Sequence, residues 1–206
     1  LTLVRMTGSR YHAQHLSTAG SVELIRTAKA EGLAVTAEVA PHTITFDDEM
    51  VMTMDPDFKM YPPLRTPSDI EALKVALVEG IIDAVATDHA PHAAAECEVP
   101  FEEAPRGVIG LETAVSAIQA ALGFSPELLF DRMSVAPARI SGLTRLGHKV
   151  EVGAPANLCV IDPALEWTAD AFRSKSANSP WKGNTMRGRV VATIFEGRLV
   201  HQVTKV

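Results

Sequence analysis

The chain has 206 residues, of which 47% are hydrophobic and 21% are charged, and its formal net charge is -6. These values are ordinary for a soluble globular protein, and the length suffices for one domain with a substantial core or for one and a half domains. The acidic balance, without a concentrated basic patch, argues against a nucleic-acid partner. No apolar run approaches the roughly 18 to 20 residues that span a bilayer. Two cysteines without CxxC spacing favour a reduced, cytoplasmic setting.

The first part of the chain alternates between helix and strand. Residues 1–6 predict the end of a helix that stops at Gly8, so we expect the chain to begin inside a domain. The apolar patterns then predict, in order, a strand over 10–15, a helix over 22–30, a strand over 33–39, a helix over 69–79 capped by Thr66 or Ser68, and a strand over 81–85. This alternation is typical of parallel strands joined by right-handed crossovers.

Polar side chains stand where these strands end. His15 is the last residue of the first strand, His42 follows the second, and the third runs into the motif ATDHAPH over residues 86–92, which contains Asp88. In parallel sheets and barrels the functional site lies at the carboxyl ends of the strands. Burying a bare carboxylate there costs several kcal/mol unless a metal ion or a cation neutralises it. The motif therefore favours a metal site over the alternative, a salt-bridged structural Asp88 beside solvated histidines.

One histidine pair is expected to be split by strand geometry. His12 and His15 are an odd number of residues apart, so a regular strand places them on opposite faces. We therefore expect one of them to be a metal ligand and the other to be structural.

The remainder of the chain changes character. Residues 47–57 predict a short helix and loop, 59–65 a proline-stiffened extended segment, and 93–106 an acidic loop that could cover a pocket. Helices are expected over 111–122, 125–133 and 137–142, and strands over 156–162, 190–196 and 198–203, with an irregular segment over 174–188. We divide the chain into an α/β part, residues 1–148, and a β part, residues 149–206.

Six segments together resemble one family. They are HLST (15–18), AEVAPH (37–42), PPLR (62–65), ATDHAPH (86–92), GVIG (107–110) and APANL (154–158). Over nearly the whole chain the sequence resembles the bacterial type I dihydroorotases of the amidohydrolase superfamily. The motif around Asp88 is the most specific part. His92 favours dihydroorotases over dihydropyrimidinases, hydantoinases and allantoinases, which usually vary the residues after the Asp-His pair.

The resemblance implies a fold and a missing half. The family folds as a (β/α)8 TIM-type barrel with a small β-sandwich built from both chain ends, and this sequence matches the carboxyl-terminal half. Residues 1–148 would supply barrel strands six to eight, and 149–206 part of the sandwich. The family's His-x-His pair, its bridging Asp or carboxylated Lys, and a further His belong to the other half. We expect the chain alone to be inactive and not to fold stably without that half.

The resemblance also assigns roles to the chemistry-bearing residues. His15 and Asp88 would be ligands of a binuclear zinc centre, and Asp88 would double as the general acid/base. His92 would hold the substrate carboxylate. His42 and His89 would support the ligands or be structural.

Two further segments would contact the substrate. The backbone at Pro105, Arg106 and Gly107 would touch the substrate ring. Tyr61 stands where the family often has an asparagine that contacts the substrate, and this departure leaves substrate choice open.

The expected reaction is the reversible ring closure of N-carbamoyl-L-aspartate to L-dihydroorotate in de novo pyrimidine biosynthesis. One alternative is a dihydropyrimidinase or hydantoinase, which would accept substrates without the carboxylate. Another is a non-catalytic homologue that scaffolds aspartate carbamoyltransferase, which loss of the upstream His-x-His pair would indicate. A homodimer or a complex with aspartate carbamoyltransferase is the expected assembly.

Overall fold

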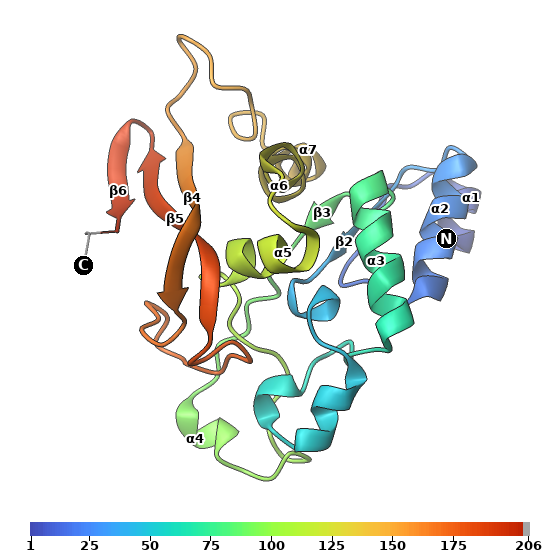
Figure 1. The fold of residues 1–206 in the computed structure, drawn as a ribbon. Helices are drawn as coiled ribbons and strands as arrows, with labels where there is room; N and C mark the ends of the chain where they lie inside the picture. Colours follow the sequence, from blue (N-terminus) through green and yellow to red (C-terminus); the bar gives the residue numbers. More distant parts are fainter. Residues whose placement is uncertain (204–206) are drawn as a thin grey trace.

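A computed structural model describes residues 1–203, which form two separate three-stranded sheets with helices around them (Figure 1). The helices are α1 (Thr2–Thr7), α2 (Ala19–Ala30), α3 (Pro67–Glu79), α4 (Ala94–Cys97), α5 (Ala114–Leu122), α6 (Pro126–Phe130) and α7 (Ala136–Ser141), with 3-10 turns at His42–Ile44, Asp48–Thr53 and Pro56–Phe58 and a π turn at Asp131–Val135. The strands are β1 (Tyr11–Ala13), β2 (Val35–Val39), β3 (Ala84–Val85), β4 (Leu158–Thr168), β5 (Thr185–Phe195) and β6 (Arg198–Gln202).

The first sheet is parallel, in the order β1-β2-β3. Tyr11 pairs with Val35, and Glu38 pairs with Ala84. Helix α2 connects the first two strands and α3 lies between the second and third along the chain, so the predicted α/β alternation is confirmed. The core is formed by apolar side chains of α2, α3 and the three strands, which pack in one cluster. Because the three strands are parallel, their carboxyl ends lie at one common edge of the sheet.

Local chemistry explains where the two long helices begin. The Thr18 side chain accepts a hydrogen bond from the Ser21 amide at the start of α2. Thr66, and not Ser68, caps α3 by accepting from the Asp69 amide. Because these side chains satisfy amide groups that have no partner inside the helix, they fix the helix starts. Helix α2 begins at Ala19, three residues earlier than its apolar stripe predicts.

The parallel strands are shorter than predicted. Strand β1 ends at Ala13, and β3 covers only Ala84–Val85. Further along, His15 has φ 52° and Asp88 has φ 48°, which are left-handed values that a strand cannot contain. The chain thus leaves the sheet just before each of these two side chains.

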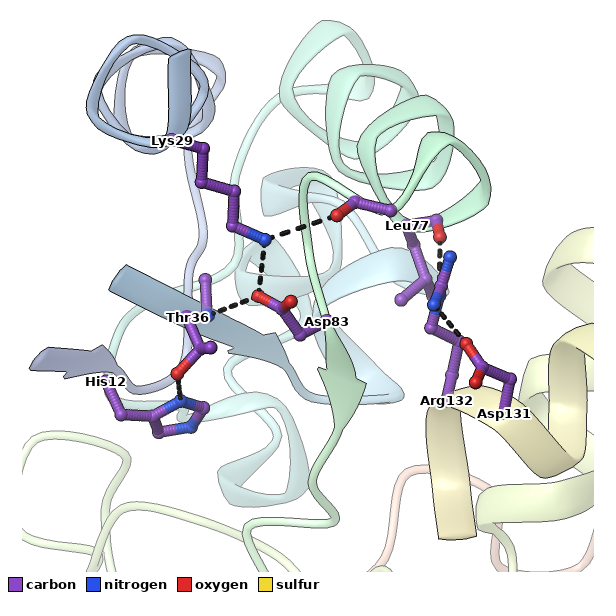
Figure 2. Close-up of polar contacts among 9 residues, drawn as sticks. His12, Lys29, Thr36, Leu77, Asp83, Asp131 and Arg132 are labelled. Carbon is purple, nitrogen blue, oxygen red and sulfur yellow. Dashed lines mark hydrogen bonds and ion pairs between the residues drawn. The ribbon is translucent and has the colours of Figure 1, made fainter. Parts of the chain in front are cut away.

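A buried carboxylate fastens α2 to the sheet at the opposite end of the strands (Figure 2). Asp83 Oδ2 lies 2.6 Å from Lys29 Nζ, on α2, and accepts a hydrogen bond from the Ala37 amide at 2.9 Å. Lys29 Nζ also donates to the Gly80 carbonyl at 3.2 Å. Because Asp83 is buried, this pairing satisfies a group that would otherwise be costly in the core.

The second sheet is antiparallel, in the order β4-β5-β6, with the predicted hairpin at Gly197. Strand β5 starts at Thr185, inside the segment predicted to be irregular. Helix α5 lies between the two sheets (Figure 1): Ala117 packs with Trp181 and Met186, while Ile118 packs in the cluster of the parallel sheet. The second layer of a sandwich stays a prediction. From residue 1 to residue 203, no helix is long and apolar enough to cross a membrane.

Candidate active site

The candidate site lies at the carboxyl ends of β1, β2 and β3, where the sequence predicts it. His15 follows β1, His42 begins the turn after β2, and Asp88 follows β3. His15 and Asp88 both adopt positive φ, although neither is a glycine. Such a conformation costs of order 1–3 kcal/mol per residue and persists where the surrounding structure enforces it, which is common at functional sites.

His15 and Asp88 face each other. Asp88 Oδ1 lies 3.7 Å from His15 Nε2, which is too far for a hydrogen bond. His15 Nδ1 lies 3.3 Å from Glu38 Oε1, on β2, without hydrogen-bond geometry. This buried nitrogen has no hydrogen-bond partner among residues 1–203. The imidazole therefore stands between two carboxylates with Nε2 directed toward Asp88.

His12 and His15 both lie close to the carboxylate of Glu38. Its other oxygen, Oε2, lies 3.0 Å from His12 Nε2, and His12 Nδ1 lies 2.7 Å from Thr36 Oγ1 (Figure 2). The expectation that His12 and His15 point away from each other is wrong, because it assumed a regular strand through His15. With β1 ending at Ala13, the left-handed turn at His15 brings its ring back toward Glu38.

His42 is the most deeply buried member of the group, at 2% exposure. Burial lowers its pKa to about 4, the charge of Asp88 works in the opposite direction, and the charge of His15 lowers it further. His42 is therefore neutral at pH 7, and its ring adds no positive charge beside His15 and Asp88.

The donor set fits two ligands of a metal ion. Two donor atoms that are each about 2.0–2.2 Å from one ion lie up to about 4 Å apart, so the 3.7 Å between His15 Nε2 and Asp88 Oδ1 suits a shared cation. A proton on Nδ1 would face the Glu38 carboxylate, 3.3 Å away, and would leave the lone pair on Nε2 for the metal. Residues 1–203 contain no cluster of three or more His, Cys, Asp or Glu that could hold a metal by itself. A complete centre would need further ligands.

A second group of predicted residues gathers on the loop after Asp88. His92 Nε2 lies 3.0 Å from the Arg106 carbonyl, and His92 Nδ1 lies 3.9 Å from Glu96 Oε2. The Arg106 guanidinium stands over the ring of the exposed Tyr61, 4.6 Å from its centroid. Lys59 Nζ donates to three main-chain carbonyls of the same loop, between residues 101 and 104. The loop thus joins His92, Arg106 and Tyr61 in one place.

Close backbone approach explains the glycines of this loop. Gly107 has φ +99°, and a Cβ there would lie 2.7 Å from the Ala90 Cβ.

His89 contacts the backbone of the same region. His89 Nδ1 accepts hydrogen bonds from the amides of Gly110 and Leu111 at 3.1 and 3.4 Å. His89 Nδ1 is therefore a hydrogen-bond acceptor, and both of its contacts are to main-chain amides.

Three residues that contribute to this arrangement escape the sequence analysis. Glu38 carried a signal, because a carboxylate inside an otherwise apolar strand needs a partner. Lys59 and Asn178 carried none, because each acts by contacting main-chain groups far away in the sequence.

Comparisons with known proteins find relatives over nearly the whole chain. A family model described as "Amidohydrolase family" matches residues 4–200. The chain is 45% identical to the dihydroorotase of Anaeromyxobacter dehalogenans, over 100% of the chain and 48% of that protein, and 45% identical to the dihydroorotase of Streptomyces coelicolor, over 95% and 47%. The chain spans about half the length of these curated relatives.

Solved structures show the same fold. The L-hydantoinase (dihydropyrimidinase) of Arthrobacter aurescens superposes with a TM-score of 0.90 at 29% identity, covering 100% of this chain and 48% of that one. The dihydropyrimidinase of Brevibacillus agri gives a TM-score of 0.88 at 22% identity, covering 98% and 46%, and supports the fold alone. The family model matches nearly the whole chain, and the solved structures share its fold. The chain therefore belongs to the amidohydrolase family.

Proposed function

We propose that the chain is the carboxyl-terminal half of a zinc-dependent dihydroorotase, which interconverts N-carbamoyl-L-aspartate and L-dihydroorotate. The observation that carries this proposal is the pair of His15 Nε2 and Asp88 Oδ1, 3.7 Å apart at the ends of two parallel strands. His92, on the same loop as Asp88, adds the group that would recognise a substrate carboxylate.

The proposal extends to the architecture of the whole protein. In this proposal β1, β2 and β3 are strands six to eight of a (β/α)8 barrel, residues 1–148 are the barrel part, and 149–206 belong to a β-sandwich. The parallel order of the strands and the TM-score of 0.90 support the barrel. The remaining metal ligands would then come from the other half, at the same end of the barrel.

The chain's own residues would perform two tasks at the metal centre. His15, through Nε2, and Asp88, through Oδ1, would hold a divalent ion, with the Glu38 carboxylate beside the other nitrogen of the His15 ring. When bound, zinc supplies a water ionised near neutral pH and a Lewis acid for the amide carbonyl. Asp88 would accept the proton of the attacking water and return it to the leaving ring nitrogen.

His92 is prepared to bind an acid. Its Nε2–H donates to the Arg106 carbonyl, which leaves Nδ1 for another partner. A carboxylate, that of Glu96, already lies on the Nδ1 side at 3.9 Å. In the protonated form, Nδ1–H would donate to the substrate carboxylate. The Arg106 guanidinium over Tyr61 would add a positive charge for a dianionic substrate.

A hydantoinase-type activity is the second candidate, because a hydantoinase structure matches with a TM-score of 0.90. Cyclic ureides without a carboxylate distinguish a dihydroorotase from a hydantoinase. A dihydroorotase should lose most of its catalytic efficiency on dihydrouracil or hydantoin, because His92 then has no charged partner. A non-catalytic scaffold for aspartate carbamoyltransferase would turn over neither class.

The test is to measure metal content and dihydroorotate hydrolysis together on the full-length protein and on its Asp88→Asn variant. We expect bound zinc in the parent and a loss of at least about a thousandfold in kcat in the variant, because the general base is removed. Asp48→Asn, which changes an exposed carboxylate, is the matched control and should retain parental activity. A parent that binds no metal and hydrolyses neither substrate class would overturn the proposal.

A further inference from the structure

A buried asparagine ties the carboxyl-terminal segment to the loop of the candidate site. Asn178 lies between β4 and β5 and is 7% exposed. Its side-chain Nδ2 donates to the carbonyls of Ala90 and Gly107, at 2.9 and 3.1 Å, and its Oδ1 accepts from the His92 amide at 3.3 Å. Its own carbonyl accepts from the Ile109 amide at 2.9 Å. These contacts hold two stretches of the loop against each other.

The chemistry of the three side-chain contacts fixes the orientation of the amide. Both protons of Nδ2 face carbonyl oxygens, and Oδ1 faces an N–H group. The reversed orientation would place an oxygen against two oxygens and an NH2 group against an N–H. Aspartate would have the same shape but lack both donors, and a shorter side chain would leave buried main-chain groups without partners. The position therefore requires an amide of this length.

The two stretches carry the groups assigned to substrate binding. His89 and Val108 form a parallel bridge, and Asn178 fastens the chain next to it on both sides. His92 Nε2 then meets the Arg106 carbonyl. We propose that Asn178 is a positioning residue that sets the distance of His92 from the Arg106–Gly107 backbone, and so the affinity for a substrate carboxylate. This proposal rests on the proposed function for its substrate.

The kinetic expectation separates affinity from chemistry. In the full-length protein, Asn178→Asp and Asn178→Ala should each raise KM for dihydroorotate about tenfold or more, while kcat changes less than about threefold. Aspartate loses the two hydrogen bonds that Nδ2 donates, and alanine loses all three of the side chain. The Asp88 and His15 pair is left intact. Asn184→Ala, which removes an exposed amide of the same segment, should leave both parameters unchanged.

A double-mutant cycle tests whether the effect passes through His92. In a His92→Ala background, Asn178→Ala should raise KM much less than in the parent, because the positioned imidazole is absent. A general loosening of the fold would instead lower activity equally in both backgrounds. Equal KM effects with and without His92, or a loss confined to kcat, would overturn the proposal.

Hydrogen exchange tests the arrangement without any turnover. In the unmodified full-length protein, the His92 amide should be protected, since its hydrogen bond is to Asn178 Oδ1. It should exchange faster in Asn178→Ala and not in Asn184→Ala. An unprotected His92 amide in the parent would contradict the proposal even if no variant folds. A parent that is inactive but shows this protection would instead contradict the proposed function and leave the positioning intact.

Discussion

The buried imidazole of His42 makes the stability of the protein depend on pH. Its pKa is lowered to about 4 chiefly by burial, whereas a histidine in an unfolded chain titrates near 6.5. Between these pH values His42 binds a proton in the unfolded chain but not in the folded protein, so the free energy of unfolding falls as the pH falls. The shift corresponds to roughly 3 kcal/mol, present in full above about pH 6.5 and lost on approaching pH 4.

We therefore expect the metal-free full-length protein to lose about 3 kcal/mol more stability between pH 7 and pH 4 than its His42→Gln variant, which cannot be protonated there. Urea unfolding at several pH values measures both slopes. Other groups that titrate in this range affect both proteins alike, so the difference isolates His42. Parallel slopes would show that His42 is protonated in the folded state.

Gly107 is the glycine whose replacement should be most costly in the loop. An alanine at φ +99° is strained, and its Cβ would lie 2.7 Å from that of Ala90. We expect Gly107→Ala to lower the free energy of unfolding by about 2–4 kcal/mol. It should also raise KM, since the backbone at Arg106 and Gly107, which is proposed to contact the substrate, must shift. Gly142→Ala is the matched control: φ is +70°, but nothing lies within 4 Å of the added Cβ, so only the strain of about 1 kcal/mol should appear. Equal losses in chemical denaturation would exclude the contact with Ala90 as a cause.

At the scale of elements, the Lys29 and Asp83 pair joins α2 to the parallel sheet (Figure 2). Asp83→Asn removes the negative charge and leaves the ammonium of Lys29 facing a neutral amide in a half-buried site. We expect a loss of about 1–3 kcal/mol in the free energy of unfolding. Adding Lys29→Met should recover part of this loss, because the unpaired charge is then gone. A double variant less stable than Asp83→Asn would argue that the lysine contributes mainly through the Gly80 carbonyl.

Lys59 fastens the loop over residues 93–106 through hydrogen bonds to its main chain. Its ammonium donates to the carbonyls of Phe101, Glu102 and Ala104, at 2.6, 2.9 and 2.7 Å, which uses all three of its protons. Lys59→Met should free the loop, so we expect proteolytic cleavage within it to become at least about tenfold faster, with a smaller change in global stability. Lys175→Met, at an exposed position, should cleave like the parent. An unchanged cleavage rate would show that other contacts hold the loop.

Sequence reasoning succeeded where the signal is local. The order of helices and strands, a cap of α3 at Thr66 or Ser68 and the hairpin at Gly197 all follow from neighbouring residues; the structure confirms them and selects Thr66 as the cap. It failed where the backbone leaves regular geometry: the left-handed turn at His15 reversed the expected facing of its ring relative to His12. The side-chain contacts of Asn178 join residues more than 70 positions apart, and no local pattern encodes them.

At the scale of the whole molecule, both sheets and several helices present apolar surface. In the order β1-β2-β3, the outer strands β1 and β3 each pair with one neighbour within residues 1–203. Leu3 and Met6 on α1 are 73% and 76% exposed, and Leu24 on α2 is also exposed. Unpaired strand edges and exposed apolar side chains favour association with other chains.

We therefore expect residues 1–206, expressed alone, to aggregate or to unfold without a cooperative transition, whereas the full-length protein should unfold cooperatively and bind zinc. The physical reason is that these apolar faces would be covered by the other half of the barrel, which also supplies the remaining metal ligands in the proposed function. Sedimentation, thermal unfolding and metal analysis on both proteins measure the difference. Co-expression of the two halves as separate chains should restore solubility if coverage, and not covalent continuity, is what matters. A soluble, monomeric fragment with a sharp unfolding transition would show instead that the core around α2, α3 and the parallel sheet is sufficient by itself.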